Sequence, residues 1–281
     1  MHCDSHVHVI GTLAQYPQVP QRTYLASVAP LETLRQLGAS RGISRFVIVQ
    51  PSFYGTDNSA ALDAIAALGG NGRGVAVVDV DNAPQPLLDD LARRGIRGLR
   101  INLYSPLGNS TPFDVAFAKT ARVAKPMNWH VEVIVGIDTI ANHAELLARS
   151  EAPVVIDHYA VYGQQRPDSA AARTVLELLR QPHVWIKLSA PYRVGADPLA
   201  TKPDAEWVKA ITSRAAERCV WGSDWPHTPP NEQHPGPDQS PPYRPLSYAR
   251  LVDDFRAALG SDTLFEQVMS ANPARLYGFA D

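Results

Sequence analysis

The run Arg45-Phe46-Val47-Ile48-Val49-Gln50 is apolar without interruption between its two polar ends. Such a run suits a strand that is covered on both faces, as the strands of parallel sheets are, whereas a half-exposed strand alternates apolar and polar residues. Val154-Val155-Ile156 has the same character further along the chain. These two runs predict a buried parallel sheet.

β-rich stretches and stretches of helical periodicity alternate on both sides of the first run. Eight strands are predicted, over Met1–Val9, Arg45–Gln50, Gly74–Val80, Gly98–Tyr104, Trp129–Val135, Pro153–His158, Val184–Ser189 and Arg218–Gly222. Helices are predicted between them, over Leu31–Arg41, Ala60–Leu68, Leu87–Arg93, Thr139–Ala148, Ala170–Leu179 and Leu251–Leu259. Eight β-then-α units without a compositional break predict an α/β fold, a single (β/α)8 TIM-type barrel domain over residues 1–281.

A doubly wound open sheet is the alternative fold. It normally has fewer strands and a glycine-rich turn after the first one. The chain has no G-x-G-x-x-G motif after its first predicted strand and no phosphate loop. The closed barrel is therefore favoured.

The composition is that of an ordinary globular protein: 281 residues, 45% hydrophobic and 19% charged, with a net charge of -2. The chain has no Lys/Arg cluster of the kind that would indicate a nucleic-acid or membrane partner. The N-terminus lacks the basic and apolar regions of a secretory signal, and we expect a cytoplasmic protein. Cys3 and Cys219 are too few for a disulfide framework, so both are expected to be reduced core residues.

Cys3-Asp4-Ser5-His6-Val7-His8 places two imidazoles two residues apart. Side chains at this spacing point to the same side of a strand, which in a barrel can be the interior. A lone buried His is usually structural, but a pair facing a barrel interior is hard to explain as core filler. His6 and His8 are therefore candidate catalytic residues.

Two further candidates follow later strands. His158 ends the sixth predicted strand, and Asp224 follows the eighth within Trp221-Gly222-Ser223-Asp224-Trp225-Pro226-His227. The catalytic groups of (β/α)8 barrels lie at these carboxyl ends. Each residue alone has a structural alternative, a turn cap in the case of Asp224, but the four together predict an active site.

These motifs resemble the amidohydrolase superfamily, and within it the branch typified by 2-pyrone-4,6-dicarboxylate lactonase. The resemblance extends from Asp4 to Tyr277. Further matching segments are Gln50–Asn58, Arg97–Asn102, Trp129–Glu132 and Lys187–Arg193. The resemblance implies a hydrolase that opens a small carboxylated lactone. In this mechanism Asp224 takes a proton from water, and His6, His8 and His158 polarise the carbonyl that the water attacks.

Metal dependence is left open by the residues. His6, His8, His158 and Asp224 are also a workable shell for one divalent ion such as Zn or Mn. Metal-dependent relatives have a further His near the end of the fifth strand, where this chain has Ile134, and His130 lies too early. This departure favours a site with no metal or other cofactor. Glu132 leaves the alternative open, because it could either bind a metal ion or orient a water molecule.

A small acidic lactone is the expected partner, and the protein is expected to be a monomer or small homo-oligomer. Tyr54, Arg100, Lys187 and Arg193 lie near predicted strand ends and are candidates for holding its carboxylate, for which Arg is suited by its bidentate geometry. The other expected substrate-binding residues are Asn102, Glu132, Ser189 and His227. Tyr159-Ala160-Val161 lacks the basic residue of the dicarboxylate lactonase pattern, so a muconolactone or aldarolactone type of substrate fits as well.

Other functions remain open at this stage. A metal-dependent decarboxylase of an aromatic or unsaturated acid uses the same residues in the superfamily, and a lactone isomerase would replace water by a substrate carboxylate. A non-catalytic binding protein is disfavoured because all the candidate residues are present. The proline-rich stretch 226–245 after the last strand predicts a semi-rigid rim over the pocket, with a solvated linker as its alternative.

Overall fold

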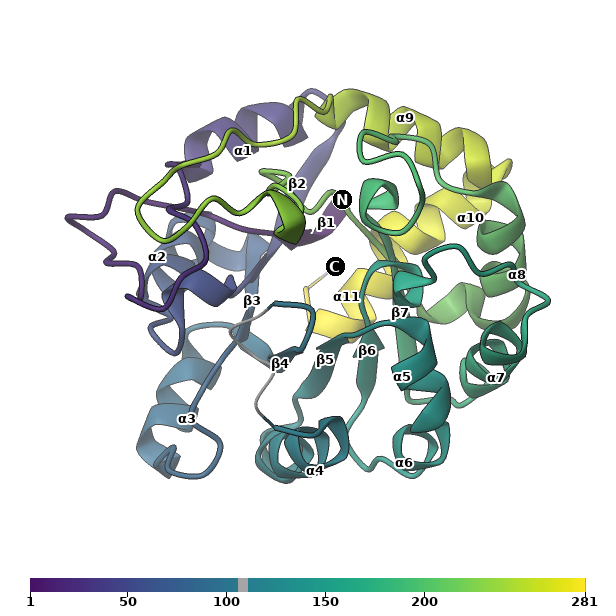
Figure 1. The fold of residues 1–281 in the computed structure, drawn as a ribbon, viewed down its shortest axis with the longest axis horizontal. Coiled ribbons are helices and arrows are strands. Elements are labelled where there is room, and N and C mark those ends of the chain that lie inside the picture. Colours follow the sequence, from purple (N-terminus) through teal and green to yellow (C-terminus); the bar gives the residue numbers. More distant parts are fainter. Residues whose placement is uncertain (106–110, 281) are drawn as a thin grey trace.

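Eight parallel strands form the centre of the molecule, each hydrogen-bonded to the next in chain order. The structure is a computed structural model that describes residues 1–105 and 111–280. The strands are β1 His2–Val7, β2 Ile43–Val49, β3 Gly72–Ala76, β4 Ile96–Asn102, β5 His130–Ile134, β6 Val154–Ile156, β7 Val184–Ser189 and β8 Cys219–Gly222. Figure 1 shows the helices around these strands, so the predicted (β/α)8 barrel is confirmed. The predicted domain 1–281 includes 106–110 and 281, which lie outside the described residues.

Contacts between the first and last strands bring the two edges of the sheet together. The His8 amide donates to the Trp225 carbonyl, and the Asp224 amide donates to the His6 carbonyl, each at 2.8 Å. The Asp4 carboxylate adds a side-chain link, because it accepts from the Ser223 amide at 2.9 Å. The residues that join the barrel edges therefore belong to the same motifs as the candidate catalytic residues.

Five of the six predicted helices are present, the sixth is divided in two, and four further helices of the described residues were not predicted. The helices are α1 Leu31–Ala39, α2 Ser59–Leu68, α3 Gln85–Arg93, α4 Phe113–Ala124, α5 Ile137–Asn142, α6 Ala144–Ala148, α7 Ala170–Leu178, α8 Ala205–Ala215, α9 Tyr248–Leu259, α10 Asp262–Glu266 and α11 Asn272–Tyr277. The single helix predicted over Thr139–Ala148 was wrong, because the backbone leaves helical geometry at His143 and gives α5 and α6. Among the described residues, no helix has the length and apolar character needed to cross a membrane.

The third strand differs most from its predicted bounds. It was predicted over Gly74–Val80 but spans Gly72–Ala76. The Asn58 side chain accepts from the Val77 amide at 3.1 Å and donates to the Val77 carbonyl at 2.9 Å. Both backbone groups of Val77 are thus taken by a side chain, which ends the strand ladder at this point.

The C-terminal helix α11 closes the end of the barrel where the strands begin. Arg73 of β3 donates to the carbonyls of Tyr277 and Gly278 at 3.2 and 2.7 Å. The Tyr277 ring also lies edge-on to His130 at the start of β5, with 5.6 Å between the ring centroids. Cys3 is buried in the same interior cluster, and Cys219 is also buried and free, as expected. The carboxyl ends of the strands are therefore left for the active site.

Candidate active site

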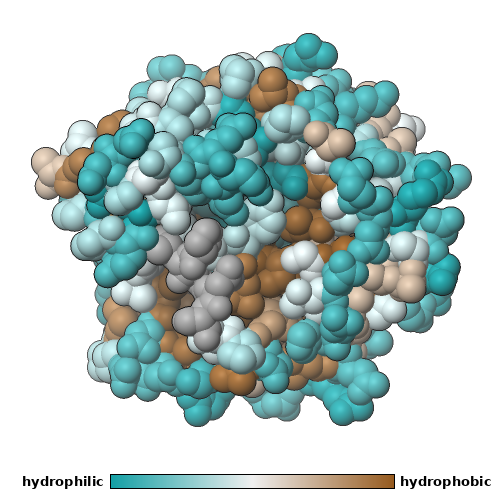
Figure 2. Space-filling view, viewed as in Figure 1, coloured by the Kyte–Doolittle hydropathy of each residue, from teal (hydrophilic) through white to brown (hydrophobic). Residues whose placement is uncertain are grey.

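A cavity lies at the carboxyl ends of the strands. Its lining includes His8, Arg100, Asn102, His158, Arg193 and Asp224. Figure 2 shows this face of the molecule, with apolar side chains around the hollow in its middle and polar ones along the outer edge. Three of the four predicted catalytic residues thus line one cavity, and His6 lies directly behind it against His8 and His158, at ring-centroid distances of 5.1 and 4.8 Å.

A break in strand register in β1 accompanies the inward position of His6, and of His8 directly after the strand. The pairing of β1 with β2 shifts between Asp4 and Val7. Such a bulge changes the side to which the following residues point. Cys3 faces the interior before the shift, and His6 still does so after it. His6 is also packed against Gly222 of β8, where an added Cβ would lie only 2.6 Å from the His6 Cβ.

Asp224 sits on a tight turn directly after β8. Its backbone has a φ of 58°, in the left-handed region that Asp tolerates better than most residues. Oδ2 accepts from the Tyr192 hydroxyl at 2.8 Å and pairs with the Arg193 guanidinium. Oδ1 faces Nε2 of His8 at 3.3 Å and Nε2 of His6 at 3.6 Å. One carboxylate oxygen is therefore anchored, and the other faces the histidines.

The environment of Asp224 keeps its carboxylate ionised. Burial by itself would raise the pKa of Asp224, but Arg193 and the neighbouring histidines outweigh burial and hold this pKa well below its ordinary value. In return, Asp224 raises the pKa of Arg193. The site thus contains an ionised carboxylate at any pH near neutrality.

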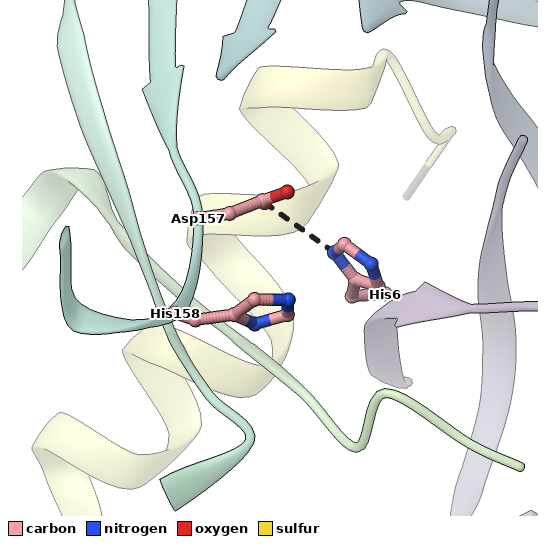
Figure 3. A group of neighbouring side chains, drawn as sticks. All are labelled: His6, Asp157 and His158. Atoms are coloured by element: carbon pink, nitrogen blue, oxygen red, sulfur yellow. Dashed lines mark ion pairs between the residues drawn. The ribbon is translucent and has the colours of Figure 1, made fainter. Parts of the chain in front are cut away.

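His158 follows β6 and is neutral near pH 7. Burial lowers its pKa to about 4. Its backbone has a φ of 47°, and Tyr159, Ala160 and Val161 also have positive φ. This left-handed turn directs the imidazole toward His6, as Figure 3 shows. Nδ1 lies 2.8 Å from the Ser189 hydroxyl, whose rotatable proton can bond it. Nε2–H is then available as a donor.

A second group of charged residues lies inside the barrel, behind the histidines. Lys187 pairs with Glu132 and lies 3.3 Å from Oδ1 of Asp157, while Nη2 of Arg100 lies 3.6 Å from Oδ2 of Asp157. Burial alone would raise the pKa values of both carboxyl groups, but the cations outweigh it and lower both. Asp157 has no predicted role from the sequence, although a charged residue directly after an apolar strand was a signal that could have indicated one.

The structure divides the predicted substrate-binding residues into two sets. Arg100, Asn102 and Arg193 line the cavity. The other five lie outside its lining: Tyr54, Glu132, Lys187, Ser189 and His227. The Tyr54 hydroxyl accepts from the Gly11 amide at 3.2 Å, and Lys187 and Glu132 are enclosed in the barrel. His227 lies behind Asp224, with Nδ1 at 3.2 Å from the Tyr192 hydroxyl.

Loops supply residues that the motif analysis missed. Tyr24, Thr228, Asn231 and His234 line the cavity. The His234 ring packs on Tyr24 with 4.4 Å between centroids, and Nδ1 of His234 lies 2.7 Å from the Thr23 hydroxyl. No local pattern marks these residues, because two loops far apart in the sequence bring them together. Their position agrees with the rim predicted for the stretch 226–245.

His6, His8 and Asp224 are close enough to hold one cation, since their ligand atoms lie within 4.8 Å of one another. Nδ1 of His8 lies 2.7 Å from the Val49 carbonyl and must donate to it, so Nε2 is the ring atom that faces Asp224 and the site. His6 does not fit the same role. Its Nδ1 lies 3.0 Å from the Lys187 ammonium, so the Nδ1 lone pair is occupied. The neutral His6 ring then carries its proton on Nε2, the atom that a cation would need. The donor set as it stands therefore lacks one ligand.

Comparison with known proteins gives consistent matches over nearly the whole chain. The sequence profile of the amidohydrolase family matches residues 3–279. A 4-sulfomuconolactone hydrolase from Hydrogenophaga intermedia is 28% identical, with 98% of this chain and 88% of the relative covered. A 2-pyrone-4,6-dicarboxylate hydrolase from Comamonas testosteroni is 29% identical, with 98% and 89% covered. A structure from Acinetobacter baumannii, described as a probable 2-pyrone-4,6-dicarboxylic acid hydrolase with citric acid bound, is 25% identical, with a TM-score of 0.81 and 99% of each chain covered.

Proposed function

The chain belongs to the amidohydrolase family, and we propose that it hydrolyses a small carboxylated lactone without a metal cofactor. The observation that carries the proposal is the arrangement of Asp224. Its Oδ1 faces the Nε2 atoms of His6 and His8 beside a cavity that His158 also lines. Two relatives named as lactone or pyrone hydrolases match 98% of the chain, which supports the substrate class.

Asp224 acts as the base. Oδ1 takes a proton from a water held next to it, and the oxygen of that water forms a bond to the lactone carbonyl carbon. A carboxylate with so low a pKa is a weak base, so it gains the proton only as positive charge develops on the attacking water. Its anchors on Arg193 and Tyr192 fix Oδ2 and leave Oδ1 for this step.

Imidazole groups stabilise the oxygen that becomes negative. Burial keeps His158 neutral, and its Nε2–H can donate toward the cavity while Ser189 bonds Nδ1. His6 offers a second Nε2–H by the argument given above. Fixed donors aimed at a developing oxyanion contribute about 3 to 4 kcal/mol each in well-studied enzymes. The ring C–O bond then breaks, and protonated Asp224 returns its proton to the leaving alkoxide. The products are a hydroxyl and a carboxylic acid on one molecule.

Arg100 is the best placed group for the substrate carboxylate. It lines the cavity, and its contacts with carboxylates are long, with Nε 3.8 Å from Oε1 of Glu132 and Nη2 3.6 Å from Oδ2 of Asp157. Its Nη1 donates to the Gln50 carbonyl at 3.0 Å, which fixes the guanidinium plane. Arg193, by contrast, already bonds Asp224 and the Thr228 hydroxyl, the latter at 2.6 Å.

Proton release from a panel of carboxylated lactones tests the proposal, because each ring opening produces one carboxylic acid that ionises near neutral pH. We expect turnover by chelator-treated enzyme and a loss of about 10²- to 10⁴-fold in kcat for Asp224→Asn. Asp253→Asn, at an exposed carboxylate, is the matched control and should retain activity. Turnover that needs added Zn or Mn would contradict metal independence, and full activity of Asp224→Asn would remove the proposed base.

A further inference from the structure

The Lys187 ammonium is surrounded by three buried polar neighbours, Glu132, Asp157 and His6. The side chain is 0% exposed and comes from β7. Nζ pairs with Oε2 of Glu132, lies 3.3 Å from Oδ1 of Asp157 and lies 3.0 Å from Nδ1 of His6. A lysine ammonium has three donors and no acceptor. Glu132 and His6 therefore each accept a proton from it, and Asp157 adds an ionic attraction.

The contact with His6 decides where the imidazole carries its own proton. An Nδ1–H would point one donor at another over 3.0 Å, so Nδ1 must present its lone pair to Lys187. Burial, and next the charge of Lys187, lower the pKa of His6 well below its ordinary value, so the ring is neutral. A neutral imidazole has one N–H, and this proton must then be on Nε2. Nε2 of His6 is buried and has no hydrogen-bond partner among the described side chains and backbone.

Asp157 is the competitor for the same nitrogen. Its Oδ1 lies 3.4 Å from Nδ1 of His6, and Figure 3 shows the carboxylate on that side of the ring. Without Lys187, this carboxylate would attract a proton to Nδ1 and leave a lone pair on Nε2. A carboxylate or carbonyl that accepts from one ring nitrogen is the usual partner of a metal-binding histidine. His8 already has this arrangement through the Val49 carbonyl.

We propose that Lys187 is a positioning residue that fixes the proton of His6 on Nε2, which makes His6 a hydrogen-bond donor toward the cavity and a poor ligand for a divalent cation. His6 thus carries its proton on Nε2, whereas His8 has a proton on Nδ1. The Lys187 ammonium sets the His6 tautomer, and the Val49 carbonyl sets that of His8. The inference concerns the active site of the proposed lactonase, but it rests on contacts that are present without substrate.

Long-range ¹H–¹⁵N NMR of histidine-labelled protein tests the tautomer directly. The ring signals of His6 are assigned by their loss in His6→Gln. We expect a protonated Nε2 and an unprotonated Nδ1 for His6, whereas His8, assigned through His8→Gln, serves as the internal contrast with a protonated Nδ1. A protonated Nδ1 on His6 in the wild-type protein would overturn the proposal, whatever the protein hydrolyses.

Zinc affinity provides the second measurement. Lys187→Met alone would leave buried carboxylates without a cation, so the comparison uses K187M/E132Q, which keeps the net charge of the cluster. Glu132→Gln alone keeps Lys187 beside His6 and is the matched control. We expect the double variant to bind Zn²⁺ at least about 10-fold more tightly than the control, because one more nitrogen becomes a ligand, within the 10- to 100-fold range of such outer-shell effects.

The proposal fails if the double variant and Glu132→Gln bind Zn²⁺ equally, or if the His6 tautomer is the same in both. Thermal unfolding of each variant verifies that a folded protein is compared. Neither readout uses a lactone. A wrong substrate class would therefore leave the tautomer and the zinc affinities as expected, and the two failures are distinguishable.

Discussion

At the scale of single residues, Arg193 controls the acidity of Asp224. The guanidinium pairs with Oδ2 and is the main charge that lowers the pKa of this buried carboxyl group. A carboxylate base with a lowered pKa is ionised above that pKa. Its ionised form, and with it the activity, is lost only as the pH falls through that pKa. Wild-type kcat/KM should therefore show no acidic limb from Asp224 down to about pH 5, more than one unit above an ordinary Asp pKa.

Arg193→Gln should introduce such a limb. Removal of the cation raises the pKa of Asp224, so activity should begin to fall at a higher pH than in the wild-type protein as the solution is acidified. The measurement is kcat/KM against pH on one lactone. Arg193→Lys keeps a positive charge and should shift the limb less than Arg193→Gln. Profiles of the same shape for all three proteins would show that Asp224 is not the titrating base.

Gly222 is required by the position of His6. A Cβ at this residue would lie 2.6 Å from the His6 Cβ and 2.9 Å from its backbone nitrogen, closer than real contacts allow. Gly222→Ala should displace His6, lower kcat/KM by about 10-fold or more and cost about 1 to 3 kcal/mol of stability, as overpacking does. Gly70→Ala has open space around its new methyl group and is the control. Activity assays and thermal unfolding measure both effects, and an unchanged kcat/KM would contradict a tight dependence on His6 placement.

The sequence indicated the residues that belong to recognisable motifs. It could not indicate which other side chains each of them contacts. His6, His8, His158 and Asp224 stood out because of their spacing and their places after strands. Lys187 was expected to bind substrate because a cation near a strand end often does, yet the structure encloses it among Glu132, Asp157 and His6. Which side of β7 faces the barrel interior depends on register, and no pattern in that strand reveals it.

At the scale of elements, strands were easier to predict than loops and helix bounds. Burial on both faces gives several strands, such as β2 and β6, continuous apolar runs, and a β-rich stretch marked each of the eight. Helix α4 was not predicted, because two of its buried positions are Thr120 and Ala124, which add little to an apolar pattern. The end of β3 depends on Asn58, a residue distant in sequence from Val77. Contacts between residues so far apart in the sequence leave no local sequence pattern from which they could be predicted.

The rim of the cavity depends on a few contacts between loops. Nδ2 of Asn231 donates to the Tyr104 carbonyl at 2.8 Å and joins the proline-rich stretch to the loop after β4. Asn231→Ala should therefore raise KM several-fold with little change in kcat or in thermal stability, since the catalytic groups are on other elements. Gln233→Ala, at an exposed residue of the same turn, should change neither. Kinetics on the best lactone of the panel measure the difference, and a fall in kcat with an unchanged KM would show that this contact acts on the chemistry.

At the scale of the whole molecule, the charges in and behind the cavity cancel. Arg100, Lys187 and Arg193 are the cations, and Glu132, Asp157 and Asp224 are the anions, with all three carboxyl pKa values lowered. His6, His158 and His227 have lowered pKa values as well and add no charge near pH 7. Residues 106–110, Pro-Leu-Gly-Asn-Ser, lie outside the described residues and contain no ionisable side chain. The site therefore offers little net positive charge to its substrate.

This balance predicts a preference for one carboxylate over two. Arg100 can hold one, but the described lining of the cavity has no Arg or Lys other than Arg100 and Arg193, so a second would face Asp224 or Asp157, and an unpaired charge in a buried site is strongly unfavourable. For lactones matched in ring size, we expect kcat/KM of the monocarboxylate to exceed that of the dicarboxylate by about 10-fold or more, a difference of about 1.4 kcal/mol in transition-state stabilisation. Arg100→Gln should lower kcat/KM for the monocarboxylate and leave the corresponding uncharged lactone nearly unaffected. If the dicarboxylate is the better substrate, the Asp224–Arg193 pair must open on binding to release a second cation, and an acidic limb would then appear in the pH profile of kcat for the dicarboxylate but not for the monocarboxylate.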